Sequence, residues 1–219
     1  MRRRLLSSLG ACAVLAAALT VAVAADAPRL AVPLDGAKNA VAETNLGDLV
    51  ADAMRDAAQS DFAFIQASAL QAVTVPAGDL TPDTMRDMLV LPDEPIVVLQ
   101  LDAAHIKGAF ERSLALLPHP NKGFLQVSGL RVRFDPGQPA DARVQSIVSI
   151  ASNLPLEPNK AYRVAVPDSL ARGTLGYFRV FNGVRRERTN VTLAQALSQY
   201  AAAHSPLSPR VEGRIKATP

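Results

Sequence analysis

Residues 43–71 constrain the fold more than any other part of the chain. Thr44 or Asn45 is a suitable N-cap for a helix, and Asp48 lies in the first turn, where the helix dipole favours a carboxylate. Apolar residues then recur at spacings of three and four, which predicts one buried helical face. This face comprises Leu46, Leu49, Val50, Ala53, Met54 and Ala57.

An apolar run at residues 61–65 follows this helix and predicts a short buried strand. Residues 66–71 come where the strand ends, which is a common place for a binding site. Their sequence, Gln-Ala-Ser-Ala-Leu-Gln, contains no side chain suited to breaking bonds. We therefore expect this segment to bind rather than to catalyse.

Three further helices are predicted from their start signals. Thr81 before Pro82 combines an N-cap with a first-turn proline and predicts a short helix to about Leu89. Asp102 caps the next helix, and residues 192–204 predict a final alanine-rich helix. The inward-facing residues of the helix after Asp102 are predicted to be Ile106, Phe110, Leu114 and Leu116.

The remaining apolar segments predict strands, with several antiparallel pairs. A hairpin is expected around the turn at residues 135–137, and a polar loop is expected at residues 185–188. Helices and strands mix irregularly, so the predicted class is α+β, a single domain of mixed sheets packed with helices. The predicted strands are residues 29–34, 73–75, 95–101, 124–134, 142–150, 162–166 and 177–181.

The first 24 residues predict a signal peptide, with residues 25–219 as the mature domain. Three arginines precede an apolar stretch that ends in the small-residue signal Ala22-Val23-Ala24. The periplasm or the exterior is the expected location, without stable insertion into a membrane. An uncleaved anchor and lipidation at Cys12 remain alternatives.

Removing this leader changes the charge balance. Of 23 Lys and Arg residues three belong to the leader, which leaves 20 against 20 Asp and Glu. A nearly neutral mature chain gives no electrostatic argument for a nucleic acid partner. The one cysteine, Cys12, is also in the leader, so thiolate chemistry and disulfides are not expected in the mature domain.

Six segments, in the same order and spacing, resemble the C-terminal, substrate-specificity domain of the 5'-nucleotidase/UDP-sugar hydrolase family. They are ETNLGDLVADAM (43–54), VPAGDLT (75–81), DEPIVVLQL (93–101), FLQVSGLRVRFDP (124–136), AYRVAVPDSLARG (161–173) and VEGRI (211–215). The resemblance implies that fold. In the family, an N-terminal metallophosphoesterase domain holds two metal ions and the catalytic groups, and this chain resembles only the domain that grips the nucleoside.

The family's substrate-binding residues are replaced at the five positions that match. Gln66 and Gln71 stand where the family has an Asn and an Arg, Asp93 and Ser169 replace two base-stacking Phe residues, and Leu175 replaces an Asp. An aromatic stack is worth about 1–3 kcal/mol per base, and Arg to Gln removes a charged donor fork. We therefore predict a degenerate pocket in which nucleoside or nucleotide binding is not expected.

Other chemical signals are weak. The three histidines, His105, His119 and His204, lie far apart in sequence, so no metal ligands, catalytic residues or cofactors are predicted. The basic group of Arg179, Arg185, Arg186 and Arg188 is either an anion-binding patch or a solvated face.

These observations predict an exported, stand-alone domain that is not catalytic alone and binds a ligand or docks a partner, for which a separate metallophosphoesterase chain is a candidate. The alternative, taken from the resemblance at face value, is a 5'-nucleotidase-like hydrolase of nucleotide catabolism. A third interpretation is a degenerate domain kept only for protein–protein contact.

Overall fold

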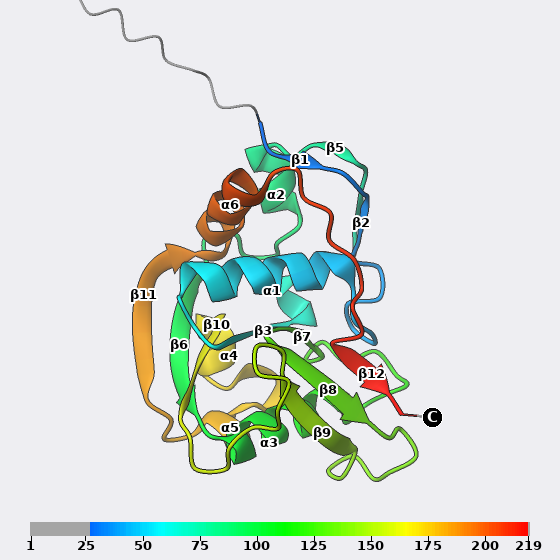
Figure 1. Cartoon of the computed structure of the whole chain (residues 1–219), viewed down its shortest axis with the longest axis vertical. Helices are drawn as coiled ribbons and strands as arrows, with labels where there is room; N and C mark the ends of the chain where they lie inside the picture. The colour runs from blue at the N-terminus through cyan, green and yellow to red at the C-terminus, as the bar shows by residue number, and fades with distance from the viewer. Residues whose placement is uncertain (1–26, 219) are drawn as a thin grey trace, which may run out of the picture.

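The computed structural model describes residues 27–218, in which helices pack around mixed sheets (Figure 1). The predicted signal peptide, residues 1–24, lies outside the described residues. Within residues 27–218, no helix has the length and apolar character needed to cross a bilayer.

A five-stranded sheet in the order β11-β6-β10-β3-β7 forms the centre of the domain. The pair β10–β3 is parallel and the other three pairs are antiparallel. Antiparallel pairing mixed with helices confirms the predicted α+β class. The strands are β3 (Phe62–Gln66), β6 (Pro95–Leu101), β7 (Leu125–Ser128), β10 (Tyr162–Pro167) and β11 (Arg186–Thr192).

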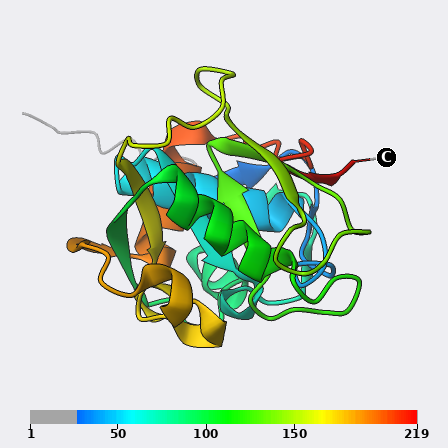
Figure 2. The same cartoon turned by 90° about the horizontal axis from the view of Figure 1, so that it is seen from below.

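Helices cover both faces of this sheet. Alternate residues of β3 point to opposite faces: Ala63 and Ile65 join the core under α1 (Asn45–Ala57) and α6 (Leu193–His204), whereas Phe62 and Phe64 join the core under α3 (Ala103–Leu114). Figure 2 shows α3 across the near face with α1 beyond the sheet. Burial on both faces explains why β3 and β6 read as continuous apolar runs.

A second sheet of three strands, β12-β8-β9, lies beside the first (Figure 1). It confirms the predicted hairpin, because β8 (Leu130–Phe134) pairs antiparallel with β9 (Val144–Ser149), and β12 (Ile215–Ala217) adds to β8 in parallel. The predicted strand 124–134 is divided at Gly129, whose φ of 85° turns the chain from one sheet into the other.

Short elements complete the domain. The predicted strand 29–34 is also divided, into β1 (Arg29–Leu30) and β2 (Leu34–Asp35), which pair with β5 (Gly78–Asp79) and β4 (Thr74–Val75). The remaining elements are η1 (Ala67–Ala69), α2 (Pro82–Asp87), α4 (Asp168–Ala171), η2 (Thr174–Gly176) and α5 (Phe178–Phe181).

Side-chain caps start the four predicted helices where the sequence placed them. Of the two candidates for α1, Thr44 is the N-cap, and its hydroxyl accepts from the N–H of Gly47 at 3.1 Å. Thr81, Asp102 and Thr192 cap α2, α3 and α6. One detail of α3 was wrong: Leu116 is 48% exposed rather than inward, because the helix ends at Leu114.

Residues 177–181 form a helical turn and not the predicted strand. Gly173 and Gly176 have φ angles of 87° and 86°, a conformation that lets the chain reverse tightly before α5. The ring of Tyr177 is fully buried, and its hydroxyl donates to the carbonyl of Gly123 at 2.6 Å. The aromatic residues here therefore pack a turn onto the core instead of alternating across a sheet.

Residues 186–192 form strand β11, which corrects the predicted polar loop at 185–188. Arg186 lies opposite Leu99 and Arg188 opposite Val97 on β6. The strand is polar because it is at the edge of the sheet, where charged side chains also discourage pairing with another chain.

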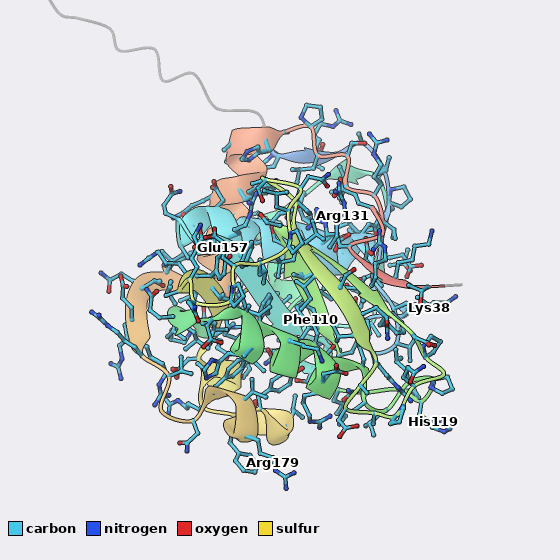
Figure 3. All side chains as sticks on the ribbon, turned by 60° about the horizontal axis from the view of Figure 1, so that its bottom comes forward. Lys38, Phe110, His119, Arg131, Glu157 and Arg179 are labelled. Carbon is cyan, nitrogen blue, oxygen red and sulfur yellow. The ribbon has the colours of Figure 1, made fainter. Side chains whose placement is uncertain are left out.

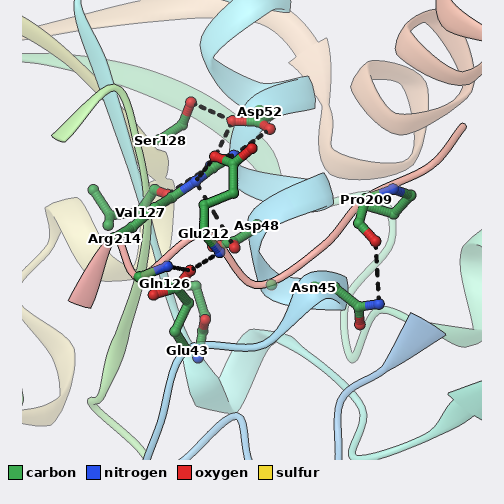
Figure 4. A network of polar contacts seen from close by, with 12 residues as sticks. Glu43, Asn45, Asp48, Asp52, Gln126, Val127, Ser128, Pro209, Glu212 and Arg214 are labelled. Atoms are coloured by element: carbon green, nitrogen blue, oxygen red, sulfur yellow. Dashed lines mark hydrogen bonds and ion pairs between the residues drawn. The ribbon is translucent and has the colours of Figure 1, made fainter. Parts of the chain in front are cut away.

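Glu43 joins the end of the chain to the start of α1 (Figure 4). Its Oε1 accepts from the N–H groups of Glu212 and Gly213 at 2.7 and 2.9 Å, and its Oε2 accepts from Ile215 at 2.9 Å. A hydrogen bond to a charged group contributes about 1.5–3 kcal/mol. Glu43 therefore holds the VEGRI segment (211–215) against the start of α1.

Arg214 makes the second connection. Arg214 is 7% exposed, and its two Nη atoms donate to the two carboxylate oxygens of Asp52 at 2.7 and 2.8 Å. Arg214 also donates to the carbonyl of Val127 at 3.0 Å, which links α1, β7 and the end of the chain. Removing one partner of a buried ion pair costs about 3–5 kcal/mol, so this contact constrains all three elements.

Asp48 is buried in the same network and differs from its expected role. The sequence predicted an ionised carboxylate that the helix dipole stabilises, but burial raises the pKa of Asp48 to about 9. Arg214, with its Nε 3.8 Å from the carboxyl, lowers this pKa only in part, and the nearby Glu43 raises it further. Asp48 is therefore protonated at neutral pH because desolvation exceeds the attraction of one arginine.

Gln126 approaches α1 closely at Gly47. Its Oε1 accepts from the N–H of Thr44 at 3.0 Å, and its Nε2 donates to the carbonyls of Asn39 and Ala42 at 3.0 and 2.7 Å. A Cβ on Gly47 would lie 2.4 Å from the Cγ of Gln126. The three hydrogen bonds hold Gln126 in place, so it cannot yield without breaking them.

We expect Gly47→Ala to destabilise the protein by about 1–3 kcal/mol, because the added methyl overpacks against Gln126. The matched control is Gly108→Ala in α3, where the nearest atom to the new Cβ is 3.6 Å away. Alanine normally favours a helix over glycine, so this control is expected to stabilise by about 0.5–1 kcal/mol. Urea denaturation measures both, and equal signs for the two variants would contradict the contact.

Asp48→Asn is expected to stabilise the protein at pH 8 by several kcal/mol relative to pH 4, because each unit of pH between the two pKa values of Asp48 costs the wild type about 1.4 kcal/mol. Above about pH 4 the unfolded Asp48 ionises while the folded one keeps its proton up to about 9, so the wild type loses stability across this range. The gain should shrink toward zero near pH 4. Chemical denaturation between pH 4 and 8 tests it, with exposed Asp141→Asn as the control. A difference that does not change with pH would refute the protonated state.

Candidate functional site

The best candidate site is a groove at the edge where the parallel strands β3 and β10 end and β6 begins. It has a volume of about 510 Å³ and is lined by residues 91–95 together with Asp168, Ser169, Arg172 and Thr174. We call it the Leu91 groove. The carboxyl ends of parallel strands meet at one edge of a sheet, which explains why segments distant in sequence converge here.

Three of the five predicted site residues come together at this groove. Asp93 and Ser169 line it directly. Gln66, at the end of β3 and 3% exposed, lies behind the lining, where its Nε2 donates to the Ser169 hydroxyl at 3.1 Å. The sequence alone linked these positions only through the resemblance, and the fold places them side by side.

The other two predicted residues are not among the residues that line the groove. The backbone of Gln71 donates to the Met88 carbonyl at 2.9 Å and accepts from Asn39 Nδ2 at 3.1 Å, while its side chain is exposed. Leu175 has a left-handed φ of 57° and packs beside the α3 core. In this structure Gln71 contributes backbone hydrogen bonds, and Leu175 contributes a turn and a packing contact.

The charged groups of the groove are paired with one another or with the backbone. Arg86 donates two hydrogen bonds to Asp93 at 2.9 and 2.8 Å, and these bonds lower the pKa of the Asp93 carboxyl. Glu94 accepts from the N–H of Ser169 at 2.7 Å. Each carboxylate is therefore already oriented by the protein itself.

Arg172 is held in the same way from the other wall. Its Nε donates to Asp168 at 2.7 Å, one helical turn earlier, and this bond raises the pKa of the Arg172 guanidinium. The atoms left facing solvent are mainly apolar, including those of Leu91, which is 59% exposed. The groove therefore offers an aliphatic surface between paired charges.

Several lining residues did not emerge as site residues from the sequence. Arg172 and Thr174 could have been suggested by their closeness to Ser169, and Leu91 with Pro92 by standing directly before Asp93. Pro95 was predicted only as the start of a strand. Their shared position depends on the meeting of β6 and α4, which no local pattern encodes.

Within residues 27–218, no three His, Cys, Asp or Glu side chains are grouped so that they could hold a metal ion. His105, for example, lies in α3, where its Nδ1 is 2.8 Å from Asp102.

Comparisons with known proteins agree on one family. Residues 20–183 match the family model for the 5'-nucleotidase C-terminal domain. The 5'-nucleotidase of Diplobatis ommata is 28% identical over 190 residues, which are 79% of this chain and 33% of that protein. A 5'-nucleotidase-related protein of Glossina morsitans morsitans is 30% identical, over 70% of this chain and 28% of that protein.

Solved structures show the same fold. The structure of a 5'-nucleotidase precursor from Thermus thermophilus aligns with a TM-score of 0.80 at 27% identity, over 87% of this chain and 39% of that one. The NAD nucleotidase of Haemophilus influenzae aligns with a TM-score of 0.76 at 16% identity, over 87% of this chain and 37% of that one.

These matches cover one part of each relative. The chain spans about a third of the length of the curated relatives named above. The matched part has the same mixed sheets and covering helices, and the family model covers most of the described domain. The chain belongs to the 5'-nucleotidase C-terminal domain family.

Proposed function

We propose that this domain is a non-catalytic docking module, exported by its leader, whose Leu91 groove receives an apolar segment of a metallophosphoesterase partner. The 5'-nucleotidase of Diplobatis ommata is about three times as long as the part that this chain matches. The proposal assigns binding to this domain and bond cleavage to the partner.

The observation that carries the proposal is the composition of the groove. Leu91, Pro92 and Pro95 provide its open apolar surface, while Asp93, Glu94 and Asp168 are each engaged by another group of the domain. Burying an aliphatic side chain contributes about 1.5–3 kcal/mol and needs no polar partner. An apolar segment from a protein fits this surface better than a nucleoside with many hydroxyl groups.

The groove also lacks the features that would hold a base. No aromatic side chain is among its lining residues in the described part of the chain. By the family resemblance, Asp93 and Ser169 stand where two stacking rings are expected. The Asp93 carboxylate accepts from Arg86, and the Ser169 hydroxyl accepts from Gln66. Base recognition by stacking would forgo about 1–3 kcal/mol for each missing ring.

The second candidate is a 5'-nucleotidase-like role in nucleotide catabolism, in which the groove still binds the nucleoside. The family membership and the names of the relatives favour it. The two candidates differ in what occupies the groove, which a binding experiment separates.

Adenosine or uridine at millimolar concentration is expected to leave the melting temperature unchanged. A ligand that binds only the native state stabilises it by about 2.7 kcal/mol at a hundredfold excess over its Kd, so binding would produce a clear upward shift. Differential scanning fluorimetry measures it. A saturable shift that Ser169→Phe strengthens would instead establish the nucleoside site.

Leu91→Asp is expected to abolish co-elution of Mn²⁺-dependent 5'-nucleotidase activity with the tagged protein, because it places a charge in the apolar contact. The matched control is Leu154→Asp, since Leu154 is 63% exposed and lies away from the groove. Purified protein alone should hydrolyse no nucleoside monophosphate with Mn²⁺. Turnover by the isolated protein, or equal loss in both variants, would refute the docking role.

A further inference from the structure

Beside the Leu91 groove lies a second hollow whose walls carry three arginines. It has a volume of about 450 Å³ and is lined by Val97, Asp168, Arg172, Arg186 and Arg188, which we call the arginine pocket. The volume falls within the range of about 300–1,000 Å³ that is typical of small-molecule sites. The edge strand β11 forms one wall and α4 with the residue after it forms the other.

Strand geometry puts two of the arginines on one face. Arg186 and Arg188 are two residues apart on β11, so their side chains project to the same side of the sheet. Val97 is paired with Arg188 across the ladder and lies in the floor of the pocket. The register of this edge strand, whose residues 186–188 were predicted to lie in a loop, therefore brings the arginines together.

The charges of this pocket do not balance. Asp168 pairs with Arg172, with an Nη2–Oδ2 distance of 2.6 Å. Within residues 27–218, no ion pair or side-chain hydrogen bond engages Arg186 or Arg188. The lining of the pocket thus has three guanidinium groups and one carboxylate, which leaves a local excess of positive charge.

The opposite face of the same strand provides the contrast. Glu187 points to that face and accepts from Arg163 Nη1 at 2.9 Å, so the arginine there has its own carboxylate. If the charges of β11 served only to keep the strand solvated, we would expect paired and unpaired arginines on both of its faces. The unpaired arginines of this strand are confined to the face that has the hollow.

We propose that the arginine pocket binds a phosphoryl anion carrying at least two negative charges, such as pyrophosphate or the terminal phosphates of a nucleotide. The planar donor fork of a guanidinium matches two phosphoryl oxygens, which an ammonium cannot do. Arg172, fixed by Asp168, approaches from α4, and Arg186 with Arg188 approach from β11. The site is separate from the apolar contact proposed for the Leu91 groove and shares only Asp168 and Arg172 with it.

Isothermal titration calorimetry of the full chain with pyrophosphate and with ADP tests this site. Saturable binding of pyrophosphate is expected, weaker at high salt. Arg186→Gln/Arg188→Gln should weaken it by at least about tenfold, because the variant removes two charged donor forks from the pocket. Equal affinity for ADP is expected, because only phosphates enter the pocket. Tighter binding of ADP would instead reveal a nucleoside contact and count against the docking role of the Leu91 groove.

The control variant is Lys38→Gln/Arg131→Gln, which removes the same charge from exposed positions away from β11 (Figure 3). It should keep the affinity within about twofold, because charge at a distance beyond the Debye length is screened. If the β11 variant loses its thermal transition, Arg172→Gln replaces it as the test. Absence of saturable pyrophosphate binding, or equal loss in the control, would overturn the proposal and leave the arginines as protection of a sheet edge.

Discussion

The contact between the end of the chain and α1 is the constraint on which the rest of the domain depends. The Glu43 carboxylate accepts hydrogen bonds from three backbone N–H groups of the final segment, and Arg214 donates both to Asp52 and to β7. These bonds position α1 on the central sheet and β12 beside β8. Because Arg214 is buried, it relies on Asp52 for compensation of its charge.

The central sheet brings the residues of the candidate site together at one of its edges. Strands β3 and β10 run parallel and end at one edge, where the antiparallel β6 begins. Gln66 ends β3, Ser169 follows β10 and Asp93 precedes β6. The three residues therefore lie near one another, although 103 positions separate Gln66 from Ser169 in sequence. The adjoining edge strand β11 adds the arginines, so an apolar groove and a cationic pocket lie side by side.

Local signals predicted most of the helices and several strands. Caps at Thr81, Asp102 and Thr192 act through neighbouring N–H groups, and such contacts span only three residues. The errors occurred where distant contacts decide. Tyr177 is buried and bonds the carbonyl of Gly123, so the aromatic residues that follow form a helical turn and not a strand. Arg186 pairs with Leu99 of β6, although the polar residues around Arg186 do not predict a strand.

By itself, the sequence determined the helix over residues 45–57, the buried strand after it and the family resemblance, because periodicity and caps are local properties. Only the tertiary structure decided which polar residues share a site and which carboxyl keeps its proton. Asp48 is an ordinary first-turn acid in the sequence, and its pKa rises to about 9 because the packed chain removes water from it. Burial and convergence depend on contacts between distant segments, which local patterns do not contain.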